Sequence, residues 1–304
     1  MIFYVSLLVL IVSSINAEMS FGGQTMVAPL KKVLVRRPDE SFAVTDVKKW
    51  HYTDVPNLKE AQKEHDDFVA ILKKEGVEVV YHATSLPELA DAIFVHDPVI
   101  MTNKGAIILR MGKMLRRGEE EAIENTLTAL GIPTWYKLHG DATAEAGDML
   151  WLDETTLAVG RGFRTNDEGI QQIKEAVSSL GVTVIVVDLP YDQGEEACLH
   201  LQSLISLVDY KMALVYKKFL PVAFVKYLEK NGFTLIEVPE QEYMTMGPNV
   251  LAIAPKVCCT IAGNDETKKR LELAGCKVYT YKGDEISLKA EGGATCLTRP
   301  LLRQ

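Results

Sequence analysis

Five segments of the chain share one pattern, in which a stretch with helical spacing of apolar residues stops at a glycine and a β-rich run follows. They read LKKEGVEVVYH, LTALGIPTWYKL, VSSLGVTVIVVDLP, LEKNGFTLIEVP and LELAGCKVYTY. Glycine suits the left-handed backbone position after a helix, so each segment predicts a helix, a glycine stop and a strand. The glycines lie 43 to 55 residues apart: Gly76, Gly131, Gly181, Gly232 and Gly275.

One or two further apolar runs precede each predicted helix. They are KKVLVRRP, AIFVHDPVIMTNKGAIILRM, DMLWLDETTLAVGR, HLQSLISLVDYKMALVY and NVLAIAPKVCCTIAG. Where there are two runs, the residues between them, such as NKG or LDETT, have the composition of hairpin turns. The repeating unit is therefore strand, strand, helix, strand. Five such units fit a closed ring of modules better than the plain βαβ crossovers of a doubly wound sheet.

No low-complexity stretch or linker interrupts the five units, so we expect residues 19–304 to form a single α/β domain. The first 17 residues differ from the rest. An apolar run from Ile2 to Val12 is followed by small and polar residues, a pattern typical of a secretory signal peptide. We expect entry into the secretory pathway if residues 1–17 act as a signal, and a cytoplasmic protein if synthesis begins at Met19.

Composition narrows the choice of partners. The chain has 33 basic and 41 acidic residues, a net charge of −8 and 47% hydrophobic residues, which are values of a globular protein. A nucleic-acid partner is not expected, because phosphate binding needs clustered Lys and Arg. The apolar leader is too short for a stable membrane span. A homo-oligomer is compatible with this composition.

The five cysteines favour neither a disulfide scaffold nor a metal centre. They form no Cys-x-x-Cys pair and no Cys/His spacing suited to zinc, and their odd number leaves at least one thiol free. Cys296 differs from the others, because it follows two glycines in a turn rather than an apolar run. We assign Cys258, Cys259 and Cys276 to packing, and Cys198, two residues before His200, to packing or to a thiol next to the site.

Reactive side chains fall at corresponding places in the repeat. In a ring, the same end of the first strand of every unit points toward the axis, so residues at these ends meet although they are far apart in sequence. Asp97 ends AIFVHD, and Glu145 lies in AEAGD just before MLWL. His200 opens HLQSLIS, and Cys296 follows the last unit. Asp148, also in AEAGD, is expected to fix the loop that aims Glu145.

These motifs resemble a known superfamily. FVHDP, EAGD, GRGFRTN, CLHLQS and EGGATCLTRP are similar, in the same order, to motifs of the guanidine-modifying pentein enzymes. These are five-bladed pseudo-symmetric α/β-propellers and include dimethylarginine dimethylaminohydrolases, arginine deiminases and amidinotransferases. The resemblance implies that Cys296 is the nucleophile, that His200 is the general acid/base, and that Glu145 is the carboxylate paired with His200. It also implies six substrate-binding residues: Asp91, Asp97, Arg110, Arg164, Gln202 and Glu291.

The chemistry of a guanidine agrees with this site. A guanidinium is a poor electrophile because its charge is delocalised, and a thiolate is the strongest nucleophile that side chains offer. The acids Asp91 and Asp97 would hold the cation by paired hydrogen bonds, and an arginine such as Arg164 would bind the substrate's carboxylate. A covalent thiouronium on Cys296 would then be hydrolysed to a ureido product. Neither a metal nor an organic cofactor is needed.

Three functions follow from these observations. The first is hydrolysis of methylated arginine to citrulline and an amine. The second is arginine deimination or amidino transfer at the same site. Those enzymes typically carry Asp where this chain has Gln202, and the missing charge favours the first. The third is a non-catalytic binding protein of the same fold, which would have no reason to keep Cys296, His200 and Glu145 together.

Overall fold

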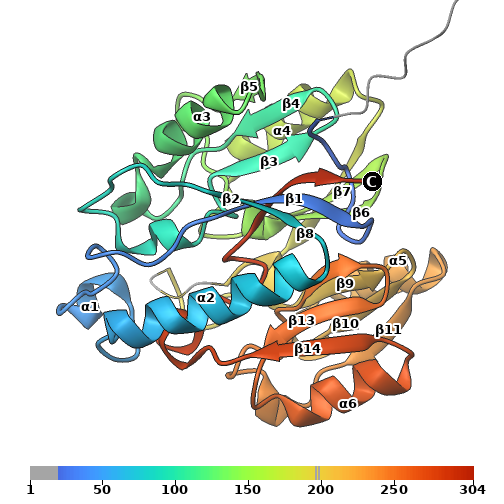
Figure 1. The fold of residues 1–304 in the computed structure, drawn as a ribbon. Helices are drawn as coiled ribbons and strands as arrows, with labels where there is room; N and C mark the ends of the chain where they lie inside the picture. Colours follow the sequence, from blue (N-terminus) through green and yellow to red (C-terminus); the bar gives the residue numbers. More distant parts are fainter. Residues whose placement is uncertain (1–19, 196, 198) are drawn as a thin grey trace, which may run out of the picture.

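The computed structural model describes residues 20–195, 197 and 199–304, so the predicted signal peptide, Met19 and Cys198 lie outside the described residues. The sequence repeat appears as small three-stranded sheets, each with one helix (Figure 1). Four sheets come from continuous stretches of chain: β3 (Val99–Thr102), β4 (Gly105–Ile108) and β5 (Thr134–Lys137); β6 (Met149–Asp153), β7 (Thr156–Arg161) and β8 (Thr183–Asp188); β9 (Ile205–Asp209), β10 (Met212–Val215) and β11 (Thr234–Glu237); β12 (Leu251–Ala254), β13 (Val257–Ile261) and β14 (Lys277–Tyr281).

Every one of these sheets has the same connectivity. The first two strands form an antiparallel hairpin, and the third strand pairs in parallel with the second. A parallel pair needs a crossover, which the helix supplies. The predicted order of strand, strand, helix and strand is therefore confirmed for these four units.

The fifth sheet joins the two ends of the described chain. Its order is β15 (Arg299–Arg303), β1 (Leu30–Val35) and β2 (Glu78–Tyr81). β15 pairs antiparallel with β1, and β1 pairs in parallel with β2. The first unit, which has a single apolar run before its helix, thus takes its missing strand from the C-terminus (Figure 1).

The helices end where the pattern predicts. Each of the five glycines has a positive φ, between 70° and 88°. A short extra helix, α1 (Val47–Trp50), precedes the first repeat helix. The repeat helices are α2 (Leu58–Lys74), α3 (Glu119–Ala129), α4 (Asp167–Ser178), α5 (Val222–Lys230) and α6 (Asp265–Leu273). In the described part of the chain, no helix is long and apolar enough to cross a membrane.

One predicted strand is wrong. The run AIFVHD was expected to be a strand, but a 3₁₀ helix over Ala90–Ile93 and a turn precede β3. Similar 3₁₀ turns, Ala146–Asp148 and Leu201–Ser203, lead into β6 and β9. All of Ala90–Ile93 is buried, so its apolar residues do not alternate and cannot distinguish a strand from a tight turn. The reactive residues therefore lie in buried entrance turns rather than on strands.

Candidate active site

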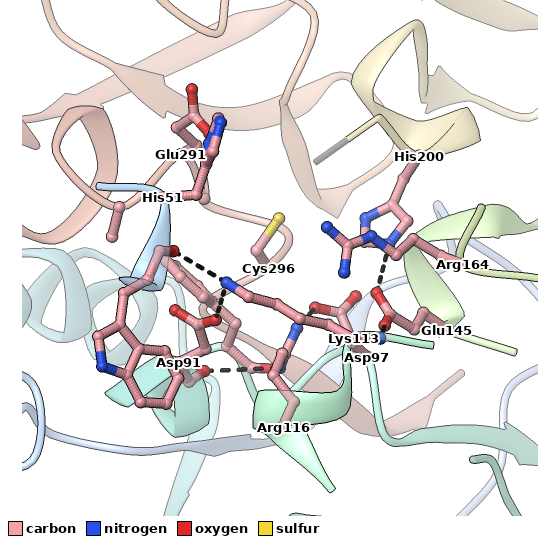
Figure 2. A pocket seen from close by; sticks show the side chains of 14 residues that line it. His51, Asp91, Asp97, Lys113, Arg116, Glu145, Arg164, His200, Glu291 and Cys296 are labelled. Atoms are coloured by element: carbon pink, nitrogen blue, oxygen red, sulfur yellow. Dashed lines mark hydrogen bonds and ion pairs between the residues drawn. The ribbon is translucent and has the colours of Figure 1, made fainter. Parts of the chain in front are cut away.

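The entrance turns bring most of the predicted site together. A cavity with about 450 Å³ of empty space, part of it open to solvent, is lined by residues from segments that are far apart in sequence (Figure 2). Seven of the nine predicted site residues line it: Asp91, Asp97, Glu145, Arg164, His200, Glu291 and Cys296.

His200 and Glu145 form a buried pair. Nε2 of His200 lies 2.8 Å from Oε2 of Glu145, and both side chains are almost fully buried. Burial alone would raise the pKa of Glu145, but the hydrogen bond and charge of His200 hold it well below its usual range. The other carboxylate oxygen accepts a hydrogen bond from the backbone N–H of Lys113 at 2.9 Å. Glu145 is therefore ionised and fixed, as a carboxylate that orients a catalytic imidazole must be.

Two neighbours of Glu145 position the pair. A Cβ atom at Gly147 would lie 2.3 Å from Nδ1 of His200, so only glycine fits against the imidazole. Asp148 is fully buried and accepts hydrogen bonds from the Leu201 N–H at 3.0 Å and the Thr165 hydroxyl at 2.7 Å. Its carboxylate thus ties the Glu145 turn to the His200 turn, in agreement with the loop-fixing role expected of it.

Cys296 is the accessible thiol of the site. It is partly buried, while the other cysteines that the structure describes are buried in the hydrophobic core. The Cys296 sulfur accepts a hydrogen bond from Nδ2 of Asn249 at 3.3 Å. Figure 2 shows the sulfur between the His200–Glu145 pair on one side and Asp91 on the other.

Asp91 and Asp97 are buried and already hold donors from the protein. Asp91 accepts hydrogen bonds from the Tyr52 hydroxyl at 2.9 Å and from Nζ of Lys113 at 2.7 Å. Asp97 accepts from the backbone N–H of Gly147 at 3.1 Å and from Nη1 of Arg116 at 2.6 Å. Each carboxylate oxygen has a second lone pair, so both acids can still accept hydrogen bonds from a cationic ligand.

Arg116 is a buried cation that the sequence reasoning missed. Its guanidinium donates to Asp97 and, at 3.0 and 2.8 Å, to both carboxylate oxygens of Glu119. Desolvation disfavours the charged guanidinium, but these carboxylates outweigh it and hold the pKa of Arg116 well above its usual value. The i, i+3 spacing gives no helical signal for this pair, because Arg116 ends a 3₁₀ helix (Met114–Arg116) and Glu119 begins α3. For Lys113 and Tyr52, nothing in the sequence pattern marks a role.

Two predicted substrate-binding residues do not reach the cavity. Nη1 of Arg110 donates to the Ala142 carbonyl at 3.4 Å, and Arg110 is absent from the cavity lining. Nε2 of Gln202 donates to the Met149 carbonyl at 2.6 Å and to the Ala146 carbonyl at 3.0 Å. Gln202 is thus committed to holding two turns together. The geometry does not favour direct substrate contact by either residue.

The remaining predicted residues lie on the cavity wall. Oε2 of Glu291 is 3.1 Å from Nδ1 of His51, and both residues have the positive φ that is uncommon outside glycine. Nη2 of Arg164 donates to the Ala197 carbonyl at 3.3 Å. Among the described residues, no group of three or more His, Cys, Asp or Glu is placed to hold a metal ion. A thiol, an imidazole–carboxylate pair and acids suited to a cation define the site of a cysteine-dependent enzyme for cationic substrates.

Comparisons with known proteins agree with this class. Residues 44–303 match the model of the family described as N,N dimethylarginine dimethylhydrolase, eukaryotic. The chain therefore belongs to this family, and the predicted relationship to the guanidine-modifying penteins is confirmed.

Individual relatives cover almost the whole chain. An uncharacterized Bacillus subtilis protein, YkgA, is 29% identical over 285 residues, which are 92% of this chain and 94% of that protein. The N(G),N(G)-dimethylarginine dimethylaminohydrolase of Pseudomonas aeruginosa is 28% identical over 271 residues, 88% of this chain and 98% of that protein. A solved structure of a cysteine-to-serine variant of the Pseudomonas enzyme, complexed with citrulline, has a TM-score of 0.74 and 26% identity, and the match covers 91% of this chain and 100% of that one.

Proposed function

We propose that the protein hydrolyses methylated arginine at its guanidino carbon and releases citrulline and a methylamine. The observation that carries the proposal is the meeting of Cys296, the His200–Glu145 pair and the acids Asp91 and Asp97 in one cavity. The similar Pseudomonas enzyme carries this activity in its name, and citrulline is bound in its solved structure. A cavity with these groups suits a planar cation next to a nucleophile.

The reaction begins with the Cys296 thiolate. It attacks the guanidino carbon and forms a carbon–sulfur bond. His200, held as a proton donor by Glu145, protonates the substituted nitrogen. The carbon–nitrogen bond then breaks and the amine departs. The guanidino carbon stays bound to the sulfur as a thiouronium. His200 then takes a proton from water, whose oxygen attacks the same carbon. The carbon–sulfur bond breaks, so that the thiolate is regenerated and the ureido group of citrulline is released.

Asp91 and Asp97 hold the substrate for this attack. Both are buried and paired with Lys113 and Arg116, and their carboxylate oxygens keep lone pairs that can accept hydrogen bonds from a bound cation. The cation in turn favours the thiolate form of Cys296. Arg164 lines the same cavity and supplies a guanidinium for the substrate's carboxylate. Binding and activation of the nucleophile are therefore coupled.

We propose in addition that the five sheets are the blades of a closed pseudo-symmetric propeller. The common connectivity of the sheets and the pairing of β15 with β1 support this arrangement.

We also propose that residues 1–17 direct export of the protein. Sequencing the N-terminus of protein recovered from the culture medium of expressing cells tests it.

Product analysis distinguishes the candidate reactions. Purified protein is incubated separately with asymmetric dimethylarginine, with arginine, and with arginine plus an amine acceptor. Citrulline, dimethylamine, ammonia and transferred amidine are then measured. Dimethylamine and citrulline in equal amounts support the proposal, whereas ammonia from arginine alone indicates a deiminase and a transferred amidine indicates a transferase. A Cys296→Ser variant with full turnover would contradict the covalent mechanism.

A further inference from the structure

The fourth sheet contributes a residue to the site that corresponds to those of the other sheets. Asn249 lies two residues before β12, as Asp97 lies two residues before β3. The sequence pattern assigns no reactive group to this entrance. The structure places the Asn249 side chain against the Cys296 sulfur, with Nδ2 as donor at 3.3 Å. Each sheet therefore has at least one polar or reactive side chain at its entrance turn.

The orientation of the Asn249 amide is fixed by its second contact. Its Oδ1 accepts a hydrogen bond from the backbone N–H of Thr295 at 3.1 Å, which leaves the NH₂ group facing the sulfur. The side chain is 4% exposed. A Cβ atom at Gly293 would lie 2.5 Å from Cγ of Asn249, so the amide packs directly on the Cys296 turn. Because Gly293 has no side chain, the Asn249 amide can occupy the space beside this turn.

We propose that Asn249 is a positioning residue that holds the Cys296 sulfur in place and stabilises its thiolate form. An N–H donor interacts more strongly with a charged sulfur than with a neutral thiol, because hydrogen bonds to ionised groups are the stronger ones. Asn249 lines a neighbouring cavity, of about 730 Å³, and not the one that contains the acids. Its direct contact in the site is with the nucleophile.

The test compares variants of Asn249 with a matched control. Asn249→Asp keeps the size of the side chain but places a carboxylate beside the sulfur, and Asn249→Ala removes the donor. Asn264→Asp is the control, because Asn264 is equally buried and its amide donates to the Thr245 and Ile261 carbonyls. The rate of alkylation of Cys296 by iodoacetamide is followed from pH 5 to pH 10 by mass spectrometry of the Cys296 peptide.

Apart from the carboxylate that Asn249→Asp adds, the charged groups around the sulfur are the same in every variant. They are Asp91, Asp97, Glu145, Glu291, His51, His200, Lys113, Arg116 and Arg164. The difference between Asn249→Ala and the wild type therefore reports the loss of the amide, and Asn249→Asp adds the effect of a negative charge at the same position. We expect Asn249→Asp to slow alkylation at pH 7 about tenfold or more and to move the midpoint upward by about one pH unit, with a smaller change for Asn249→Ala. Asn264→Asp should keep the wild-type midpoint.

Steady-state kinetics provide the second measurement. We expect kcat to fall in both Asn249 variants while KM stays within about twofold, because the amide contacts the nucleophile. Alkylation needs no turnover, so this test does not depend on the proposed substrate. If Asn249→Asp does not fold, as judged by circular dichroism, Asn249→Ala gives the result. Profiles that coincide with that of the wild type would overturn the proposal.

Discussion

His65 on α2 makes the stability of the fold dependent on pH. Its imidazole is fully buried, and neither ring nitrogen has a hydrogen-bond partner among the described residues. Burial lowers the pKa of His65 from 6.5 to about 4. Between these values the unfolded chain binds a proton that the native protein does not, so stability falls as the pH drops through this range.

The size of the effect follows from the two pKa values. A difference of about 2.5 units corresponds to a limit of roughly 3.4 kcal/mol, which is approached well below pH 4. At pH 5 the loss is already about 2 kcal/mol. It is a large part of the 5–15 kcal/mol that is typical of the unfolding free energy of proteins.

The measurement is urea-induced unfolding at pH 7 and pH 5, followed by tryptophan fluorescence, for the wild type and His65→Leu. Leucine has no titrating group and favours the helix. The difference in unfolding free energy between variant and wild type should move by about 2 kcal/mol in favour of the variant on going from pH 7 to pH 5. His139→Leu, at an exposed position, is the control and should not produce this change. Parallel pH dependences of wild type and His65→Leu would refute the reasoning.

Three further outcomes are expected. Gly147→Ala forces a methyl group into the His200 ring, so kcat should fall about 100-fold with the circular dichroism spectrum retained; an active variant would show that the ring can move away. Arg116→Met leaves Asp97 and Glu119 without their buried cation and should cost about 3–5 kcal/mol in urea unfolding, whereas a loss below 1 kcal/mol would contradict a structural role for this cation. Deletion of the last six residues removes β15 and should abolish cooperative unfolding in the same assay, while removal of the final residue alone should not.

The repeat could be predicted because its signals are local. Helices, glycine stops and hairpin turns depend on a few neighbouring residues, and all five stops were identified correctly. The pairing of β15 with β1 could not be derived in this way, because it joins segments almost a whole chain apart. The strand predicted over AIFVHD failed for another reason, since uniform burial removes the alternation that marks a strand.

The site residues also differ in whether the sequence alone could identify them. Cys296, His200 and Glu145 carry chemistry that stands out at their places in the repeat, and the structure brings all three to one cavity. Lys113 and Asn249 could not be identified, because lysine and asparagine are common surface and turn residues. Their importance comes only from contacts with Asp91 and Cys296, which depend on tertiary packing.

The pairing of β15 with β1 constrains the order in which the site can assemble during synthesis. β1 is synthesised long before β15, so the first sheet cannot be completed until β15 has left the ribosome. Cys296 lies three residues before β15 and meets Asn249 and His200 at that same late stage. Before β15 emerges, the growing chain therefore cannot hold Cys296 against Asn249 as the folded protein does.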